Sequence, residues 1–233
     1  MNLPDWIERA APPQLSHYLD RVASPRKAGL FVRHLCRGFP QIFTDPRSRA
    51  ALDAADRFEA GDIGDDEFQA AVGAAGDAQA ETQAAYNIRA YEPDAYLATA
   101  TRAAAMAAGL ARTVAEHGHY PQVLSHLRRA VLDHAGRGAG PRKNPVARVV
   151  RPLFFEHFGD TEHPVALDPA WRTEAVVGLA IRIYADRAFD RLPVLADALE
   201  DAGCANADVL GHCRGPGPHA RGCWVVDLLL GKT

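Results

Sequence analysis

Apolar residues recur at intervals of three and four along most of this chain, the spacing of one face of an α-helix. Between Ser24 and Pro40 they form a single stripe, made by Ala28, Phe31, Val32, Leu35, Cys36 and Phe39. Alanine is the most abundant residue and β-branched runs are scarce. Because alanine loses no side-chain entropy on entering a helix, this composition favours helices throughout. The sequence therefore predicts an all-α fold, a multi-helix bundle or array with a compact C-terminal helical subdomain.

Capping residues give two of the predicted helices definite ends. Ser24 can cap a helix that has Pro25 at its first position. Asp45 and Pro46 open the next helix in the same way, and Gly61 closes it. We therefore expect consecutive helices joined by short turns in this part of the chain.

One stretch interrupts the helical pattern. Residues 136–145 read GRGAGPRKNP, which has no apolar periodicity and is typical of a linker. The predicted organisation is an N-terminal helical region over residues 1–136, a linker over residues 137–145 and a C-terminal helical region over residues 146–233. Within the last region, residues 173–185 are apolar on nearly every side, which predicts a helix buried at the centre of its domain.

Length and charge exclude several classes of protein. A chain of 233 residues with 48% hydrophobic residues can bury a substantial core. Its formal net charge of −3 gives no general attraction to nucleic acid, and no apolar run reaches the roughly 18 residues of a membrane span. Four cysteines are too few for a secreted disulfide scaffold. We expect a cytoplasmic protein with no nucleic-acid or membrane partner. A protein is the kind of partner that remains.

The segment GCANADVLGHCRGPGPHARGCW, residues 203–224, concentrates the metal-binding residue types. Thiolate and imidazole ligands suit zinc, and a structural zinc site is a closed tetrahedron. The segment therefore predicts zinc as a structural cofactor, with the ligands Cys204, His212, His219 and Cys223. Only the spacing of His219 and Cys223 fits a zinc-finger template. The alternative is that the cysteines are small buried hydrophobic residues and that His212 lies at a helix C-terminus.

Two arginines in the same segment suggest an anion site or a structural lock. Arg214 and Arg221 flank a Gly-Pro-Gly-Pro turn, where they can hold a phosphate or a carboxylate. The anion can equally be internal, because four acidic residues lie close in sequence: Asp197, Glu200, Asp208 and Asp227. Since structural ion pairs outnumber functional ones, we predict an arginine–carboxylate lock between helices, with Arg214, Arg221 and Asp227 as its candidate members.

The C-terminal region also carries a family resemblance. The run FDRLPVLADALEDAGCANADVLGHCRGPGPHARGCWVVDLLLGK, residues 189–232, resembles the C-terminal signature of a large family of planctomycete-type bacterial proteins. The preceding run VALDPAWRTEAVVGLAIRIYADRA and the N-terminal runs SPRKAGLFVRHLCRGF and TDPRSRAALDAADRFEAG resemble the same proteins. This resemblance implies a bacterial, cytoplasmic, mainly helical protein. It implies no reaction and no catalytic residue.

Two functional hypotheses follow. The first is a protein-interaction or scaffold module whose C-terminal region is held together by the Cys/His/Arg cluster, with no catalytic residue. The second is a metal-dependent or thiol-dependent hydrolase that uses the same cluster, with one coordination position open to water. The ligand count separates them, because a structural site has four protein ligands and a catalytic site has three.

Overall fold

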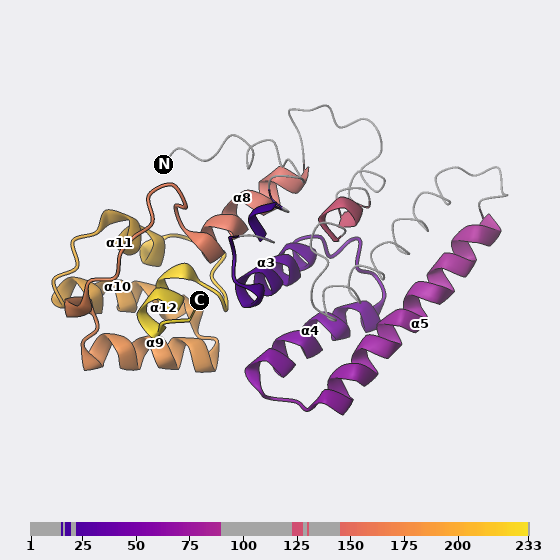
Figure 1. Ribbon diagram of the computed structural model, residues 1–233, viewed down its shortest axis with the longest axis horizontal. Coiled ribbons are helices and arrows are strands. Elements are labelled where there is room, and N and C mark those ends of the chain that lie inside the picture. The colour runs from indigo at the N-terminus through magenta and orange to yellow at the C-terminus, as the bar shows by residue number, and fades with distance from the viewer. Residues whose placement is uncertain are drawn as a thin grey trace. The chain divides into compact units, whose positions relative to one another are not determined.

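The computed structural model confirms the all-α class (Figure 1). It describes residues 15, 17–19, 22–89, 123–127, 130 and 145–232. Within these ranges the structure has eight α-helices and two short 3₁₀ helices, and no strand. None of the described helices combines the length and the hydrophobicity needed to cross a bilayer.

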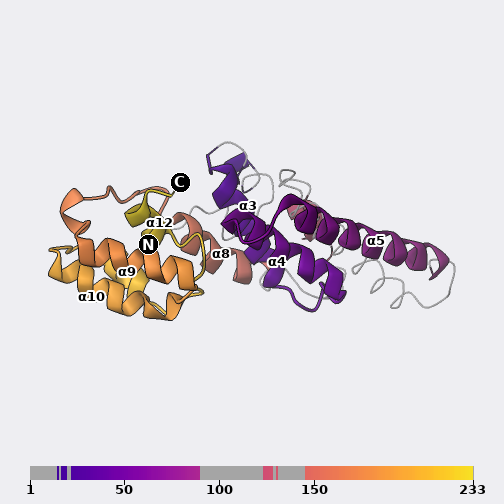
Figure 2. The same cartoon turned by 90° about the horizontal axis from the view of Figure 1, so that it is seen from below.

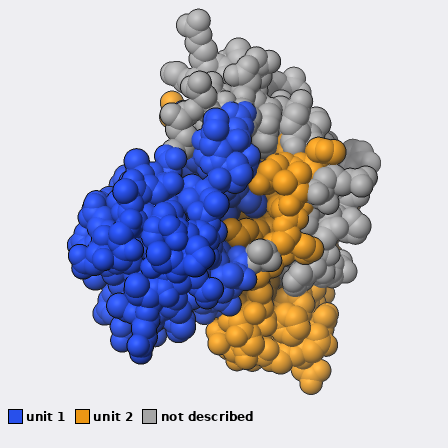
Figure 3. Space-filling view, turned by 60° about the vertical axis from the view of Figure 1, so that its left-hand side comes forward, with its two compact units in different colours: residues 1–3, 151–233 blue, residues 4–150 orange. Residues whose placement is uncertain are grey.

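The chain divides into two compact units, residues 4–150 and residues 151–233 together with residues 1–3 (Figure 3). The division falls inside helix α8 (Pro145–Phe158), just after the predicted linker. Pro145 is the first residue of α8, and the other linker residues lie outside the described part of the chain. The two units are described separately below.

The unit of residues 4–150 contains α3 (Pro25–Arg37), α4 (Pro46–Ala60) and α5 (Asp65–Arg89). The predicted caps are confirmed: the Ser24 hydroxyl accepts a hydrogen bond from the backbone N–H of Lys27, and the Asp45 carboxylate accepts one from Arg47. Helices α4 and α5 pack against each other through an apolar cluster, formed by Ala51, Ala54, Ala55, Ile63, Phe68, Val72 and Ala75 (Figures 1 and 2).

The second unit carries the candidate site. After the C-terminal half of α8 its elements are η2 (Pro169–Trp171), α9 (Glu174–Asp186), η3 (Phe189–Arg191), α10 (Leu192–Asp201), α11 (Ala207–Arg214) and α12 (Trp224–Leu230). Helix α10 packs against α9 and α11, and α12 packs against α9 (Figure 1). One apolar core joins these helices, and the thiols of Cys204, Cys213 and Cys223 are buried in it.

The prediction that residues 173–185 form a central, fully buried helix is wrong in one respect. They do form α9, which Thr173 caps through its side chain. Only one stripe of α9 is buried, however, made by Val176, Ala180 and Ile183, and Ile181 is 52% exposed. Because α9 covers α10 and α12 with a single face, its other apolar residues are not fully buried, although Leu179 and Tyr184 pack against the core.

Candidate metal centre

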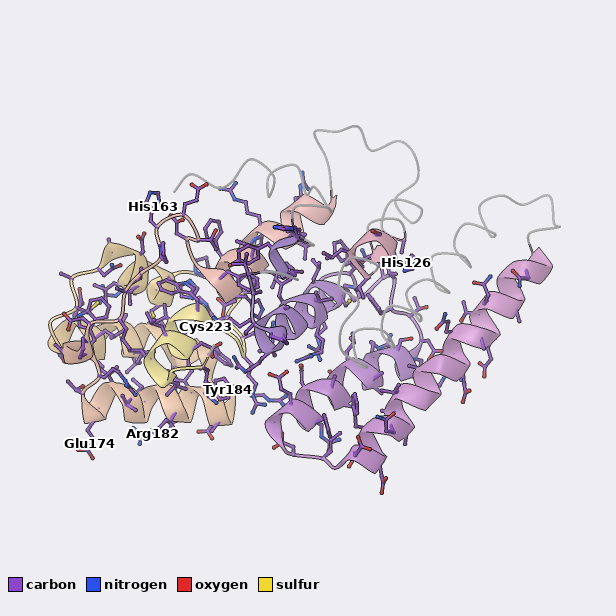
Figure 4. The ribbon with its side chains drawn as sticks, in the orientation of Figure 1. His126, His163, Glu174, Arg182, Tyr184 and Cys223 are labelled. Carbon is purple, nitrogen blue, oxygen red and sulfur yellow. The ribbon has the colours of Figure 1, made fainter. Side chains whose placement is uncertain are left out.

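Four side chains that can ligate a metal converge in the second unit. They are Glu156, His212, His219 and Cys223, and their ligand atoms all lie within 4.8 Å of one another. The donors come from three places in the chain: α8, the last turn of α11, and the loop that leads into α12. Figure 4 labels Cys223 at the start of α12.

Local structure positions His212 in the last turn of α11 and His219 in the loop that leads into α12. Asn206 caps α11 by accepting hydrogen bonds from the N–H groups of Asp208 and Val209. The loop after α11 then turns at Gly217, which has a φ of +83°. A Cβ at this position would lie 2.7 Å from the backbone nitrogen of His219, so the chain needs glycine here to bring His219 back toward α11.

Glu156 is the most constrained of the four donors. Its side chain is only 2% exposed. Oε1 accepts a hydrogen bond from the backbone N–H of Ala220 at 3.0 Å. Oε2 lies 2.8 Å from Nδ1 of His219 and 3.4 Å from Nε2 of His212. Oε1 therefore holds the loop before α12, and Oε2 faces the two histidine donors.

The two imidazoles present one nitrogen each to the group. Nε2 of His219 lies 3.1 Å from the carbonyl oxygen of Gly215. Because a carbonyl only accepts, Nε2 carries the hydrogen, which leaves Nδ1 of the neutral ring as a ligand atom. A ligating histidine typically donates its other N–H to such a group. Nε2 of His212 lies 3.2 Å from Sγ of Cys223.

Aromatic packing holds the His212 ring in place. Its centroid lies 5.0 Å from that of His219, in an edge-on arrangement, and 5.4 Å from the ring of Trp224. Trp224 in turn lies against Gly159, where a Cβ would come within 3.1 Å of the indole. Gly159 has a φ of +64°, so both its backbone conformation and the close approach of the indole favour glycine.

Burial shifts the protonation of Glu156, His212 and Cys223 toward forms without charge. It raises the pKa of the Glu156 carboxyl and raises that of the Cys223 thiol well above its usual value. Burial and the nearby His219 lower the pKa of His212 to about 3. The hydrogen bond to Glu156 raises the pKa of His219. A divalent cation at the centre would reverse the shift of the thiol, since metal ligands bind deprotonated.

Three of the spacings between donors are close to those of a tetrahedral zinc site. Zn–N bonds of about 2.0–2.1 Å and Zn–S bonds of about 2.3 Å place tetrahedral donors roughly 3.3–3.6 Å apart. Three of the donor–donor distances are 2.8, 3.2 and 3.4 Å. Zinc binding would change these three distances by a fraction of an ångström, and the other donor–donor distances do not exceed 4.8 Å.

The structure brings together three of the four metal ligands that the sequence predicts. Cys204 is not in the group: it is 3% exposed in the apolar core, after the turn that ends α10. Glu156 takes its place, although it lies outside the segment in which the sequence predicts the ligands. A detectable signal was its position in the apolar run Leu153–Phe158, because a glutamate buried in a helix face needs a partner.

The predicted arginine lock is divided between two places. Arg214 joins α11 to α10, with its guanidinium 2.8 Å from Asp197 and also hydrogen-bonded to Glu200. Arg221 instead lies over the ring of Tyr184, with its guanidinium carbon 5.2 Å from the ring centroid. Asp227 is buried on α12 and is 1% exposed. The internal carboxylates that hold Arg214 are thus Asp197 and Glu200.

Comparison with protein-family models, curated proteins and solved structures finds no match for this chain. The resemblance of residues 189–232 to planctomycete-type bacterial proteins stays a prediction. The functional conclusion therefore depends on the chemistry of the four donors.

Proposed function

We propose that this protein is a zinc-binding helical module, in which the metal stabilises the C-terminal unit and this unit serves as a protein-interaction or scaffold module. One observation carries the proposal: Glu156, His212, His219 and Cys223 place four ligand atoms within 4.8 Å of one another from three separate segments. Such convergence of buried polar groups is costly unless they are hydrogen-bonded, paired or bound to a metal.

The donor types favour zinc over other common metals. Magnesium and calcium prefer oxygen ligands, whereas this group offers one thiol, two imidazoles and one carboxylate. Zinc binds all three ligand types at short distances in tetrahedral geometry. The carbonyl of Gly215 and the N–H of Ala220 already orient His219 and Glu156, as second partners of metal ligands do.

The burial of the donors favours a structural role. Glu156 and Cys223 are almost fully buried, and the side chains of His212 and His219 are 13% and 12% exposed. Four protein ligands fill a tetrahedral site and leave no position for water or substrate. Metal-binding energy is then folding energy, which suits a module that acts through its surface.

A hydrolase is the second candidate, and one feature favours it. Two histidines and a glutamate also form catalytic zinc sites, in which water occupies the fourth position. Glu156, His212 and His219 supply that set if Cys223 stays protonated. The role of Cys223 therefore separates the two candidates.

The test is a zinc titration of the full chain with a competing chromophoric chelator. We expect one zinc per chain, a higher melting temperature with zinc, and a large loss of affinity in Cys223→Ser. The matched control is Cys204→Ser, a second buried cysteine in the same core, which should keep wild-type affinity. Absence of stoichiometric zinc, or equal losses in the two variants, would contradict the proposal. Unchanged affinity in Cys223→Ser together with ester hydrolysis would favour the second candidate.

A further inference from the structure

Two cationic side chains share one aromatic ring at the end of α9. The guanidinium carbon of Arg221 lies 5.2 Å from the ring centroid of Tyr184, and Nζ of Lys232 lies 4.7 Å from it. Tyr184 is in the last turn of α9, while Arg221 precedes α12 and Lys232 follows it. Figure 4 labels Tyr184 at this end of α9. Both ends of α12 thus bring a positive charge to one ring.

These two charges lack a compensating carboxylate in the described part of the chain. Arg214, by contrast, is bound to Asp197 and Glu200. Nε of Arg221 is buried and has no hydrogen-bond acceptor. A buried donor without an acceptor costs free energy, so Arg221 gains no internal hydrogen bond at Nε.

The distances to the ring centroid set an upper limit on the separation of the two cations. Since both lie about 5 Å from the same point, their separation does not exceed roughly 10 Å, one Debye length at 0.1 M salt. Their mutual repulsion is therefore only partly screened, and a bound anion would relieve it. Tyr184 and Arg221 are partly exposed and Lys232 is exposed, so a small ligand can reach them.

We propose that Arg221 and Lys232, positioned on the ring of Tyr184, bind a phosphate dianion, either free phosphate or a phosphate monoester. The planar guanidinium can donate two parallel hydrogen bonds to phosphate oxygens, and the ammonium adds a second charge. Two cations match the charge of a phosphate dianion and exceed that of a carboxylate. The site uses none of the four metal donors, so it goes beyond the proposed zinc function.

The experiment is calorimetric titration of the full chain, at constant ionic strength, with inorganic phosphate, O-phosphoserine and acetate. We expect saturable binding of a phosphate compound and much weaker binding of acetate. Tighter binding of inorganic phosphate assigns free phosphate as the ligand, and tighter binding of O-phosphoserine assigns a monoester. Acetate binding as tight as phosphate, or no saturable binding of either phosphate compound, would overturn the proposal.

Variants locate the site. Arg221→Gln should weaken phosphate binding about tenfold or more, Lys232→Gln should weaken it less, and Arg221→Lys should give an intermediate loss. Arg182→Gln is the control, because it removes the same charge from an exposed position on α9 and should change nothing. Equal losses in all these variants would mean nonspecific attraction. Loss in Glu156→Gln with retention in Arg221→Gln would place the phosphate on the metal, and either result overturns the proposal.

Discussion

Nδ1 of His219 lies 2.8 Å from Oε2 of Glu156, although the two residues are 63 positions apart in the chain. The other oxygen of the same carboxylate holds the N–H of Ala220. Helix α8 and the loop before α12 are therefore joined where the candidate metal ligands meet. In the proposed zinc site, Glu156 is the ligand that connects α8 to the rest of the second unit.

Glu156→Gln should lower zinc affinity by about tenfold to a hundredfold or more, because it removes a charged ligand and not only an outer hydrogen bond. The amide keeps the size of the side chain, so the variant should fold. Competition with a chromophoric chelator measures the effect. The control is Glu162→Gln, which changes an exposed glutamate of the same unit and should bind zinc as the wild type does. Equal affinities for all three proteins would remove Glu156 from the site.

Three of the four donors could be predicted from the sequence, because they lie close to one another in the chain. His212, His219 and Cys223 lie within one short segment rich in glycine and proline, so a turn can bring them together. The fourth donor could not be chosen in this way. Cys204 has the right chemistry and lies nearby in sequence, yet the turn after α10 directs it into the apolar core. The position of Glu156 among the donors depends on how α8 packs against a segment more than 60 residues away, which the local sequence pattern does not show.

The helices show the same difference between features set by neighbouring residues and features set by distant packing. Caps such as Ser24 and Asp45 act within four residues, and the structure confirms them. The burial of α9 depends on what surrounds it, and apolar residues around a helix do not reveal how many neighbours will cover it. The stripe of Val176, Ala180 and Ile183 is buried, while Ile181 is exposed.

Trp224→Ala should lower the free energy of unfolding by about 3 kcal/mol, the lower end of the range for such truncations, because the indole is only partly buried. It should also weaken zinc binding, since the indole packs on the ring of His212. Urea unfolding and zinc titration measure the two effects. Trp224→Phe keeps an aromatic ring and should restore part of both. A loss below about 1 kcal/mol would show that the indole contributes little to packing.

The stability of the unit that contains α3 should fall in mild acid because of His34. Burial and the charge of Arg37 lower the pKa of His34 to about 4 in the folded protein. Between pH 6.5 and 4 the unfolded chain therefore binds a proton that the folded chain does not, and unfolding becomes easier as the pH falls. This contribution reaches about 2 kcal/mol at pH 5.

Urea unfolding at pH 7 and pH 5 tests this, with His34→Gln as the comparison. The variant cannot titrate at this position and should lose less stability between the two pH values. If wild type and variant lose the same amount, His34 does not carry the pH dependence.

Arg33→Ala should be strongly destabilising, by about 3–5 kcal/mol. The guanidinium is 1% exposed and pairs with Asp56 and Glu59, which would keep only the more exposed Arg37 and Arg26 as counter-charges. The matched comparison is Arg57→Ala, whose ion pair with Glu67 is exposed at 46% and 56% and should cost less than about 1 kcal/mol. Thermal or urea unfolding of both variants gives the difference, and similar losses would contradict the burial argument.

Cobalt substitution tests the zinc site most directly, because the absorption of Co²⁺ reports both its geometry and its ligands. Titration of the full chain with Co²⁺ should give one ion per chain, intense visible bands of a tetrahedral site, and a thiolate charge-transfer band that Cys223→Ser abolishes and Cys204→Ser keeps. Weak octahedral bands that neither substitution changes would show that Glu156, His212, His219 and Cys223 do not hold a metal together.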